Sequence, residues 1–490
     1  MTISTMQSRL STGISGCDEI LGGGLVRHRS YLLAGSPGSG KTIFSLQWLR
    51  DGLARGERCM YITLCEPAAE VGRNAANFGW NLENVELVDL SLVTQAPSEG
   101  GNDYHMFPPS EVEGAPVWQA IHDAIQNSKP QRLMVDSVTQ LRYLATDEYQ
   151  FRRNILGLVN LLNGTECTSI FAFEPSEMER DTTVALAVDG VIRLDFRISA
   201  GLGIGIRSIQ VDKLRGSDFM SGRHPMRIKA NGISVFPHRI EHTGAVLPGE
   251  RMISSGIAEF DQLLGGGLES GTTTLLTGPT GAGKSTLGTQ FLAHYARSGR
   301  AILFTFEEPA SFIAARSRSI GTPIDAAIEC GALKIMRVNP MELYPDEFLA
   351  LVRDAVENDK RTMVMIDSLR GYQLAMEEFG TPQAHIQNLA NYLSRQNVTL
   401  LLINEVEHII STSLKATDLG VSHLADNIVL LRYAEVAGRV IKIVGCLKKR
   451  IGNFESELRE LKVGPSGIQI SEKLPRMQGV LTGVPATAYD

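Results

Sequence analysis

The sequence predicts an α/β protein with two tandem domains, each a mostly parallel sheet flanked by helices. Three observations support this fold class. A long segment is repeated, short apolar runs alternate with helical patterns in both copies, and a glycine-rich loop follows an early apolar run in each copy. Short apolar strands that alternate with helices are typical of parallel sheets.

The repeat is visible by direct alignment. Residues 11–42 align with residues 254–285 without a gap, and 15 of the 32 aligned positions are identical. The match continues further along the chain, where residues 58–67 correspond to residues 300–309. A repeat of this length indicates a duplicated domain rather than a solenoid, whose repeats are much shorter.

The repeat and the turn-forming residues suggest the domain limits. We expect the first domain at residues 1–240, the second at 241–470 and a C-terminal tail at 471–490, where no clear periodicity is present. The segment Thr94–Pro116 is rich in Pro, Gly and Ser and predicts a loop.

The apolar runs place the expected secondary structure. In the first copy, helical spacing follows the glycine-rich loop at Ile43–Leu53. Runs typical of buried strands lie in both copies, at Tyr31–Ala34, Cys59–Leu64, Arg132–Val135, Ser169–Phe173, Val191–Leu194, Ile233–Phe236 and Ala301–Phe306.

Composition narrows the class of protein. The chain has 490 residues, of which 43% are apolar and 21% charged, as in ordinary globular proteins. The net charge of −7 lowers the expectation of a duplex DNA-binding face. Six cysteines form no CxxC pair, and we expect reduced thiols rather than zinc ligands or disulfides. With no apolar leader or membrane span in the sequence, we expect a soluble, cytoplasmic protein.

Two loops carry the strongest chemical signal. Both fit the pattern G-x-x-x-x-G-K-[ST], in which backbone N–H groups and a lysine surround nucleotide phosphates at a helix N-terminus. This pattern predicts two P-loop NTPase domains that bind ATP. The expected phosphate-binding residues are Gly35, Ser36, Pro37, Gly38, Ser39, Gly40, Lys41 and Thr42 in the first copy, and Gly278, Pro279, Thr280, Gly281, Ala282, Gly283, Lys284, Ser285 and Thr286 in the second.

Carboxylates at strand ends predict the metal site. Asp136 and Asp367 each end an apolar run, where a P-loop domain places the carboxylate that holds the water shell of Mg²⁺. The hydroxyl groups of Thr42 and Ser285 are expected to ligate the metal directly. We also expect Glu307 close to the metal. An acidic residue that merely ends a strand is the alternative interpretation.

A second pair of acidic residues suggests a general base. Glu307 and Glu308 follow the strand Ala301–Phe306, where a carboxylate can take a proton from a nucleophile that attacks the γ-phosphate. The first copy has Cys65 and Glu66 instead, so only one of the two carboxylates is present. We therefore expect the two copies to differ in catalytic power.

Together these motifs resemble the KaiC family of RecA-like ATPases. The resemblance rests on the tandem P-loops, the Gly-Gly-Gly-Leu element before each, the Glu-Glu pair, the Asp-Ser strand ends and a late K-x-R motif. It covers residues 8–490. It implies two RecA-like domains, a two-tiered homohexameric ring with ATP between subunits, ATPase activity, and serine/threonine autokinase and autophosphatase activity in the second domain, as in a circadian oscillator.

The resemblance assigns roles to further residues. It implies that Glu307 is the general base of the second domain, and that the K-x-R motifs reach the nucleotide of a neighbouring subunit. By position these motif residues are Lys213, Leu214 and Arg215, and Lys448, Lys449 and Arg450, with Arg215 and Arg450 in catalytic roles. Asn77 and Ser217 match further positions at the first nucleotide pocket.

The resemblance also implies where phosphate is accepted. The family has an adjacent Ser-Thr pair, and this chain has Ser422-His423, with Thr417 at a third hydroxyl position. The corresponding residues of the first copy are Ala185 and Leu186, which carry no hydroxyl group. We expect one acceptor where the family has two, and only in the second domain.

Partners and alternatives remain open at this stage. The resemblance implies a KaiB-like regulatory protein. A KaiA-like activator is less expected, because this tail matches the family's only as far as Pro485. A RecA-type DNA motor or recombinase shares the P-loops, although the near-neutral segment Glu405–Leu419 does not favour nucleic acid. A nucleotide-gated scaffold with little turnover is the third interpretation.

Overall fold

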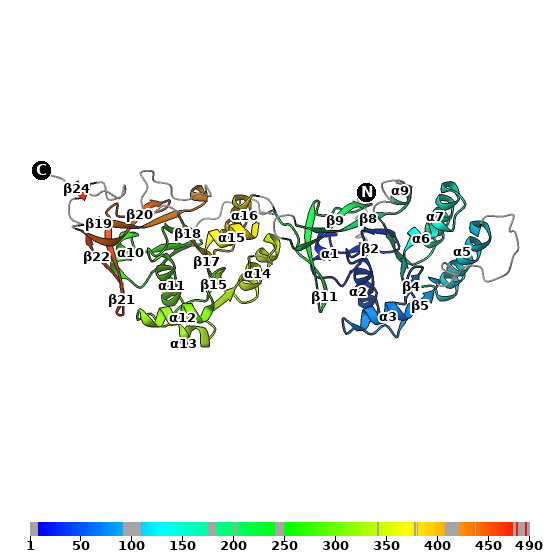
Figure 1. The fold of residues 1–490 in the computed structure, drawn as a ribbon, viewed down its shortest axis with the longest axis horizontal. Helices are drawn as coiled ribbons and strands as arrows, with labels where there is room; N and C mark the ends of the chain where they lie inside the picture. The colour runs from blue at the N-terminus through cyan, green and yellow to red at the C-terminus, as the bar shows by residue number, and fades with distance from the viewer. Residues whose placement is uncertain are drawn as a thin grey trace, which may run out of the picture. The chain divides into compact units, whose positions relative to one another are not determined.

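The computed structural model divides the chain into two compact units, residues 1–239 and residues 240–490, which we call the first and second unit. Figure 1 shows their helices and strands. The structure describes residues 8–91, 109–174, 183–199, 203–240, 249–340, 343–376, 379, 381–406, 421–436, 438–473, 477–478 and 486–487.

In chain order, the described elements of the first unit are β1 (Arg9–Leu10), α1 (Cys17–Ile20), β2 (Leu25–Val26), β3 (Ser30–Gly35), α2 (Lys41–Ala54), β4 (Cys59–Thr63), α3 (Ala68–Ala76), β5 (Val85–Asp89), α5 (Pro109–Ser128), β6 (Arg132–Asp136), α6 (Val138–Tyr143), α7 (Glu148–Asn163), β7 (Thr168–Phe173), α9 (Thr183–Ala187), β8 (Gly190–Ile198), β9 (Gly205–Leu214), β10 (Arg223–Lys229) and β11 (Gly232–Val235). Its main sheet has the order β11-β10-β9-β8-β3-β7-β6-β4-β5. The six strands from β8 to β5 are parallel, and β9, β10 and β11 extend the sheet through antiparallel pairs.

The second unit repeats this plan. Its elements are β12 (Gly249–Ile253), α10 (Ala258–Leu263), β13 (Leu268–Ser270), β14 (Thr273–Gly278), α11 (Lys284–Tyr295), β15 (Ala301–Thr305), α12 (Ala310–Ser319), α13 (Asp325–Glu329), β16 (Leu333–Arg337), α14 (Pro345–Glu357), β17 (Met363–Asp367), α15 (Leu369–Met376), α16 (Pro382–Arg395), β18 (Thr399–Glu405), the 3₁₀ turn η1 (Val421–His423), β19 (Asn427–Val436), β20 (Arg439–Lys449), β21 (Arg459–Gly464), β22 (Gly467–Lys473), β23 (Met477–Gln478) and β24 (Ala486–Thr487). The main sheet has the equivalent order β16-β15-β17-β18-β14-β19-β20-β21-β22.

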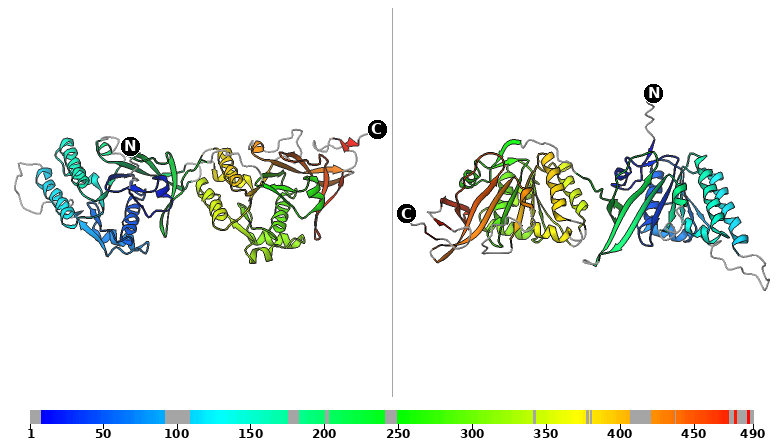
Figure 2. Two further views of the ribbon diagram at one scale, coloured as in Figure 1. Left: turned by 180° about the vertical axis from the view of Figure 1, so that it is seen from behind. Right: turned by 90° about the horizontal axis from the view of Figure 1, so that it is seen from above.

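Helices cover both faces of each sheet (Figures 1 and 2). In β3, Tyr31 and Leu33 pack in the same cluster as residues of α2 and α3, whereas Leu32 packs with residues of α6 and α7. A strand covered on both faces has no solvent-facing side, so its sequence is a continuous apolar run. The central strands were recognisable in the sequence for this reason.

The expected α/β fold with two RecA-like P-loop units is confirmed, and so are the predicted strands, with ends that differ by one or a few residues. The loop predicted at Thr94–Pro116 is wrong for residues 109–116, because α5 begins at Pro109 and includes Pro116. Val117, Ile121 and Ile125 of α5 are buried at helical spacing, and this packing outweighs the local preference of proline. Residues 92–108 lie outside the described part of the chain.

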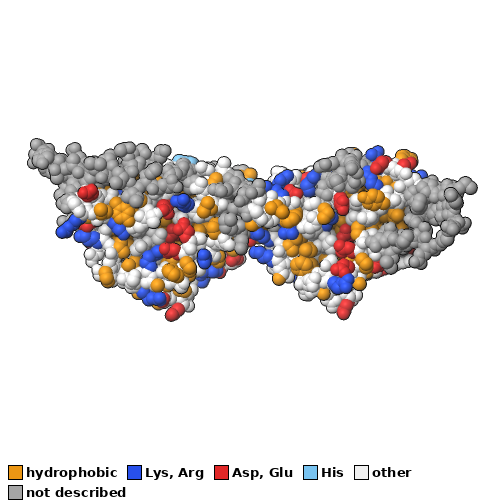
Figure 3. All heavy atoms as spheres, in the orientation of Figure 1, with side chains coloured by type: hydrophobic (Ala, Val, Ile, Leu, Met, Phe, Trp, Pro, Cys, Tyr) orange, Lys and Arg blue, Asp and Glu red, His pale blue; other side chains and the backbone are white. Residues whose placement is uncertain are grey.

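The predicted tail begins within β22 and also contains the short antiparallel pair β23 and β24. Among the described residues, none of the helices has both the length and the apolar character to cross a membrane. On the face drawn in Figure 3, lysine and arginine side chains stand in small groups separated by acidic and apolar ones.

Candidate functional site

The first P-loop lies at the carboxyl end of the central strand β3, where α2 begins. Gly40 directly precedes α2 and has a φ of 107°, a backbone conformation that side chains with a Cβ rarely adopt. A Cβ at Gly40 would also lie 2.8 Å from the Cδ1 atom of Ile228. Glycine here lets the chain turn into the helix, so that the loop lies at the helix N-terminus, where anions bind.

Lys41 is the first residue of α2. Its Nζ atom donates hydrogen bonds to the carbonyl oxygens of Gly35 at 2.5 Å and Ser36 at 3.3 Å. Burial lowers the pKa of Lys41, and the negative charges of Asp136 and Glu174 oppose this effect. The hydroxyl oxygen of Ser39 is buried and has no hydrogen-bond partner among the described residues. The loop thus holds a cation and a polar atom that an added phosphate group can satisfy.

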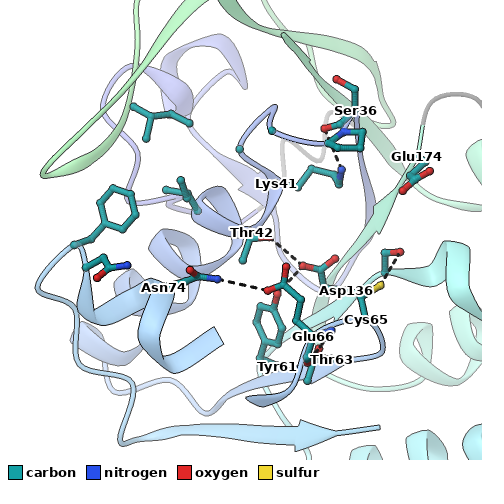
Figure 4. A pocket seen from close by; sticks show the side chains of 18 of the residues that line it. Ser36, Lys41, Thr42, Tyr61, Thr63, Cys65, Glu66, Asn74, Asp136 and Glu174 are labelled. Carbon is teal, nitrogen blue, oxygen red and sulfur yellow. Dashed lines mark hydrogen bonds between the residues drawn. The ribbon is translucent and has the colours of Figure 1, made fainter. Parts of the chain in front are cut away.

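A cavity of about 600 Å³ opens beside this loop. Its volume is that of a small-molecule site. Figure 4 shows that residues of the P-loop, of β4, of the segment after β4 and of β6 converge on it. Its lining comprises Ser36, Pro37, Gly38, Gly40, Lys41, Thr42, Ile43, Tyr61, Thr63, Cys65, Glu66, Asn74, Asn77, Phe78, Asp136, Ser137, Glu174, Arg207 and Ile228.

The residues expected at the first metal site lie together. The Thr42 hydroxyl donates to Oδ2 of Asp136 at 3.4 Å, and the buried Tyr61 hydroxyl donates to the same oxygen at 2.6 Å. Burial raises the pKa of Tyr61 well above its ordinary value, and the charge of Asp136 adds to the rise. A hydroxyl group next to a carboxylate supplies the hard oxygen donors that Mg²⁺ prefers, so these residues fit the metal.

The second P-loop has the same construction. Gly283 has a φ of 108° and precedes Lys284, the first residue of α11. The Nζ atom of Lys284 donates to the carbonyl oxygen of Pro279 at 2.7 Å. Burial lowers the pKa of Lys284, and the charges of Glu405, Asp367 and Glu307 oppose this effect.

The metal-site carboxylate of the second unit, that of Asp367, lies close to two glutamates. Burial raises the pKa of Asp367 to about 6, and the charges of Glu308 and Glu307 contribute to the rise. A hydrogen bond from the Ser285 hydroxyl lowers the pKa of Asp367 in part. Ser285 and Asp367 therefore form the same hydroxyl–carboxylate pair as in the first unit, and they fit Mg²⁺ in the same way.

The two units differ at the predicted general base. In the second unit, the hydroxyl group of Ser368 donates to Oε1 of Glu307 at 2.9 Å. In the first unit, Cys65 has the equivalent place, with its Sγ atom 3.7 Å from the hydroxyl oxygen of Ser137. Burial raises the pKa of the Cys65 thiol. A neutral thiol thus occupies the position of a carboxylate.

The next residue also differs between the units. Glu308 is bound by Arg316, whose Nη1 atom lies 2.7 and 2.6 Å from the two carboxylate oxygens. At the position equivalent to Arg316 the first unit has Asn74, whose Nδ2 atom lies 3.5 Å from Oε2 of Glu66. Burial raises the pKa of Glu66, and the charge of Asp136 adds to the rise.

The K-x-R residues of the first unit lie far from their own P-loop. β9 is antiparallel to β8, so Leu214 pairs with Gly190, the first residue of β8. The P-loop begins at Gly35, which pairs with Leu194, four residues further along β8 than Gly190. Lys213 and Arg215 therefore lie near the end where β8 begins, whereas the P-loop follows the carboxyl end of the neighbouring strand β3. Neither residue lines the cavity. Asn77 does line it, whereas Ser217 does not.

The region around Ser422 has the same contacts as its counterpart in the first unit. Lys448 donates to the carbonyl oxygen of Ser422 at 3.3 Å, as Lys213 donates to that of Ala185 at 2.8 Å. Arg450 donates to the carbonyl oxygen of His423 at 3.3 Å, and Arg215 to that of the residue after Ala185 at 3.0 Å. The Ser422–Ala185 correspondence expected from the sequence is thus reproduced in space. Thr417 lies outside the described residues.

Lys449 has a different environment from its neighbours in the K-x-R motif. Its side chain is 1% exposed, and Nζ lies 2.9 Å from Oε1 of Glu269. Nζ also donates to the carbonyl oxygens of Leu264 and Gly267, at 2.5 and 3.2 Å. The Lys449 side chain is therefore buried in contacts with its own unit. This differs from the contact with the nucleotide that the sequence predicts for this residue.

Several residues at the two sites were not found by sequence reasoning. Glu174 and Glu405 lie at the carboxyl ends of β7 and β18, and the rule that identified Asp136 would have found them. Glu405 accepts a hydrogen bond from the hydroxyl group of Thr280 in the second P-loop. Tyr61 gave no such signal, because it lies inside an apolar strand.

Comparisons with known proteins agree with this geometry. A family model described as the KaiC ATPase matches residues 10–240 and 253–474. The circadian clock oscillator protein KaiC of Prochlorococcus marinus (strain MIT 9313) is 29% identical over 98% of this chain and 96% of its own length. The protein of the same name from Synechococcus elongatus is 28% identical over 98% of this chain and 92% of its own length.

Proposed function

The chain belongs to the KaiC family of ATPases, and from this premise we propose that it binds Mg²⁺-ATP at both P-loops and phosphorylates its own Ser422. In this proposal, copies of the chain assemble into a homohexameric ring with nucleotide at the subunit interfaces. The second unit carries the serine autokinase activity and the reverse phosphatase activity. The ring serves as a timing or signalling device that interacts with regulatory proteins.

One observation carries this proposal. In each unit the P-loop lies at the carboxyl ends of the parallel strands and the K-x-R residues lie at the amino ends, as the pairing of β8 with β3 and β9 shows for the first unit. Ser422 lies at the amino ends of these strands together with Lys448 and Arg450, whereas Lys284 lies at the carboxyl ends. An acceptor in that place lies away from the γ-phosphate site of its own P-loop, which supports transfer from a γ-phosphate held by another copy of the second unit.

The residues of the second unit supply the steps of the reaction. Lys284 binds the phosphates, and the hydroxyl group of Ser422 from a neighbouring copy attacks the γ-phosphorus. The proton of that hydroxyl passes to Glu307, the P–O bond to the β-phosphate breaks, and ADP leaves with the electron pair. Arg450 of the copy that carries the acceptor neutralises the developing charge. Mg²⁺, when bound by Ser285 and Asp367, neutralises charge on the β- and γ-phosphates.

Complementation between two inactive variants tests this proposal. Lys284→Ala removes the phosphate-binding cation, and Ser422→Ala removes the acceptor. Neither variant alone should gain phosphate at position 422 with Mg²⁺-ATP. A mixture should gain phosphate on Ser422 of the Lys284→Ala chain, which ¹⁵N labelling distinguishes in mass spectrometry.

The double variant Lys284→Ala/Ser422→Ala, mixed with Lys284→Ala, is the matched control and should give no product. Two results contradict the proposal. One is wild-type protein that stays unmodified at Ser422 after incubation with Mg²⁺-ATP. The other is phosphorylation of Ser422 in Lys284→Ala protein incubated by itself.

A further inference from the structure

The first site lacks a carboxylate where the second site has its general base. Cys65 and Glu307 follow equivalent strands, and each contacts the serine after its metal-site aspartate. A neutral thiol is a very poor proton acceptor, and burial raises the pKa of Cys65 further from neutrality. Cys65 therefore cannot take over the task of Glu307.

The neighbouring carboxylate of the first site is less restrained than its counterpart. In the second unit Arg316 holds both carboxylate oxygens of Glu308 at 2.6 to 2.7 Å, so a charged donor already occupies both oxygens. In the first unit the corresponding contact of Glu66 is a single long bond of 3.5 Å from the neutral amide of Asn74. The first unit thus has Cys65 in place of the base Glu307 and Asn74 in place of Arg316. The second change compensates for the first, because it leaves Glu66 without an arginine partner at this position.

Glu66 also lies where a base is needed. It lines the cavity together with Lys41, Thr42 and Asp136. In Figure 4 its carboxylate lies between Asn74 and Asp136, on the side of the cavity that faces Thr42. We infer that Glu66, one residue after the position of the base in the second unit, is the general base of the first site. Asn74, in place of an arginine, is the positioning residue that leaves Glu66 available.

This inference rests on the proposed nucleotide hydrolysis. In the reaction, a water oxygen forms a bond to the γ-phosphorus of ATP, and Glu66 accepts the proton that the water loses. The bond from the γ-phosphorus to the bridging oxygen breaks, and its electron pair leaves with ADP. The products are ADP and inorganic phosphate, and no other reactant is consumed.

The first test isolates the first site. Glu307→Gln removes the base of the second site and leaves its P-loop intact, so the remaining turnover reports the first site. Adding Glu66→Gln should lower this turnover by about 10² to 10⁴, the usual contribution of a general base. Glu83→Gln is the control with the same loss of charge, because Glu83 is exposed and lies outside the cavity, and among the described residues its carboxylate bonds only Asn81. It should leave turnover unchanged.

The second test addresses Asn74. In the Glu307→Gln background, Asn74→Arg should bind Glu66 and lower kcat about tenfold or more with little change in KM, as expected for a charge-assisted bond to the base. Adding Cys65→Glu rebuilds the arrangement of Glu307, Glu308 and Arg316, and should restore kcat. A purely structural role for Asn74 would not give this rescue.

The outcomes separate this inference from the proposed function. If the Glu307→Gln protein still hydrolyses ATP and Glu66→Gln leaves that rate unchanged, the base is another group and the inference fails, while the proposed ATPase stands. If Asn74→Arg leaves kcat unchanged, the role of Asn74 fails. If Glu307→Gln protein hydrolyses no ATP, the first site has no working base, and the inference fails together with hydrolysis at that site.

Discussion

Replacing Asp367 by asparagine should stabilise the nucleotide-free second unit at neutral pH, although it removes a carboxylate that we assign to Mg²⁺. Burial and the nearby carboxylates of Glu308 and Glu307 raise the pKa of Asp367 to about 6. Compared with the unfolded chain, the folded protein therefore favours the protonated form of Asp367. At neutral pH the ionised form is a cost that a bound cation relieves.

The size of this cost follows from the pKa difference. The ordinary pKa of aspartate is 3.8, so the folded unit binds the proton more tightly by about 2 pKa units, or about 3 kcal/mol. The stabilisation from this proton is complete below pH 3.8 and is lost as the pH rises through about 6. Wild-type protein carries the full cost at pH 8 and about half of it at pH 5.

Urea unfolding of protein free of nucleotide and metal measures this difference. Circular dichroism follows both units, whereas tryptophan emission follows the first alone, because Trp48, Trp80 and Trp118 all precede residue 240. Asp367→Asn should raise the free energy of unfolding of the second unit by up to about 3 kcal/mol at pH 8 and by less at pH 5. The tryptophan transition should not move.

Asp354→Asn is the matched control, because Asp354 is exposed on α14 and has its hydrogen bond with Asn358. It should change stability little at either pH. Destabilisation by Asp367→Asn at pH 8, or a gain that is the same at pH 5 and pH 8, would refute the reasoning about Asp367.

Three further changes have defined outcomes. Arg132 is fully buried and donates to Glu57 at 2.6 Å, so Arg132→Met should destabilise the first unit by about 3 to 5 kcal/mol, measured by tryptophan emission during urea unfolding. Lys449→Met leaves the buried Glu269 without its ion pair and should cost the second unit about as much, measured by circular dichroism. Arg215→Ala should lower ATP hydrolysis without loss of nucleotide binding at the first site, measured by phosphate release and equilibrium binding.

The fold and the phosphate loops were predictable because their signals are local. A strand buried on both faces is a continuous apolar run, and a P-loop needs glycines and a lysine at fixed spacing. Asp136 and Asp367 were found by the same logic, because they end such runs. The repeat added a check that a single domain does not offer, since the P-loop residues and the strand-end aspartates of one copy have counterparts in the other.

The remaining features depend on contacts between distant segments. Tyr61 reaches Asp136 across two neighbouring strands, and the second unit has Leu303 at the equivalent position. Asn74 and Arg316 lie eight residues after the glutamates that they contact, and only the path of the chain after the strand brings each pair together. No spacing rule in a single sequence identifies such pairs, because either residue alone is ordinary for an exposed helix.

The glycine triplet before each P-loop shows why roles cannot be transferred between the copies by position alone. In the first unit Arg9 of β1 donates to the carbonyl oxygens of Leu21 and Gly24. In the second unit Lys449 of β20 donates to the equivalent carbonyl oxygens, those of Leu264 and Gly267. Both units thus have a cation at these oxygens, but a different strand supplies it in each.

This exchange explains the environment of Lys449. The second unit has Met252 at the position of Arg9, and the first has Leu214 at the position of Lys449. The cation therefore lies on a different strand in each unit, and Glu269, where the first unit has Val26, balances the charge of Lys449. A lysine within a K-x-R motif suggests a nucleotide contact, yet the carbonyl oxygens of its own unit already satisfy it. Lys448 and Arg450 also donate to carbonyl oxygens of their own unit, but the Arg450 side chain is 55% exposed. Arg450 is therefore the residue of this motif that we propose for a neighbouring nucleotide.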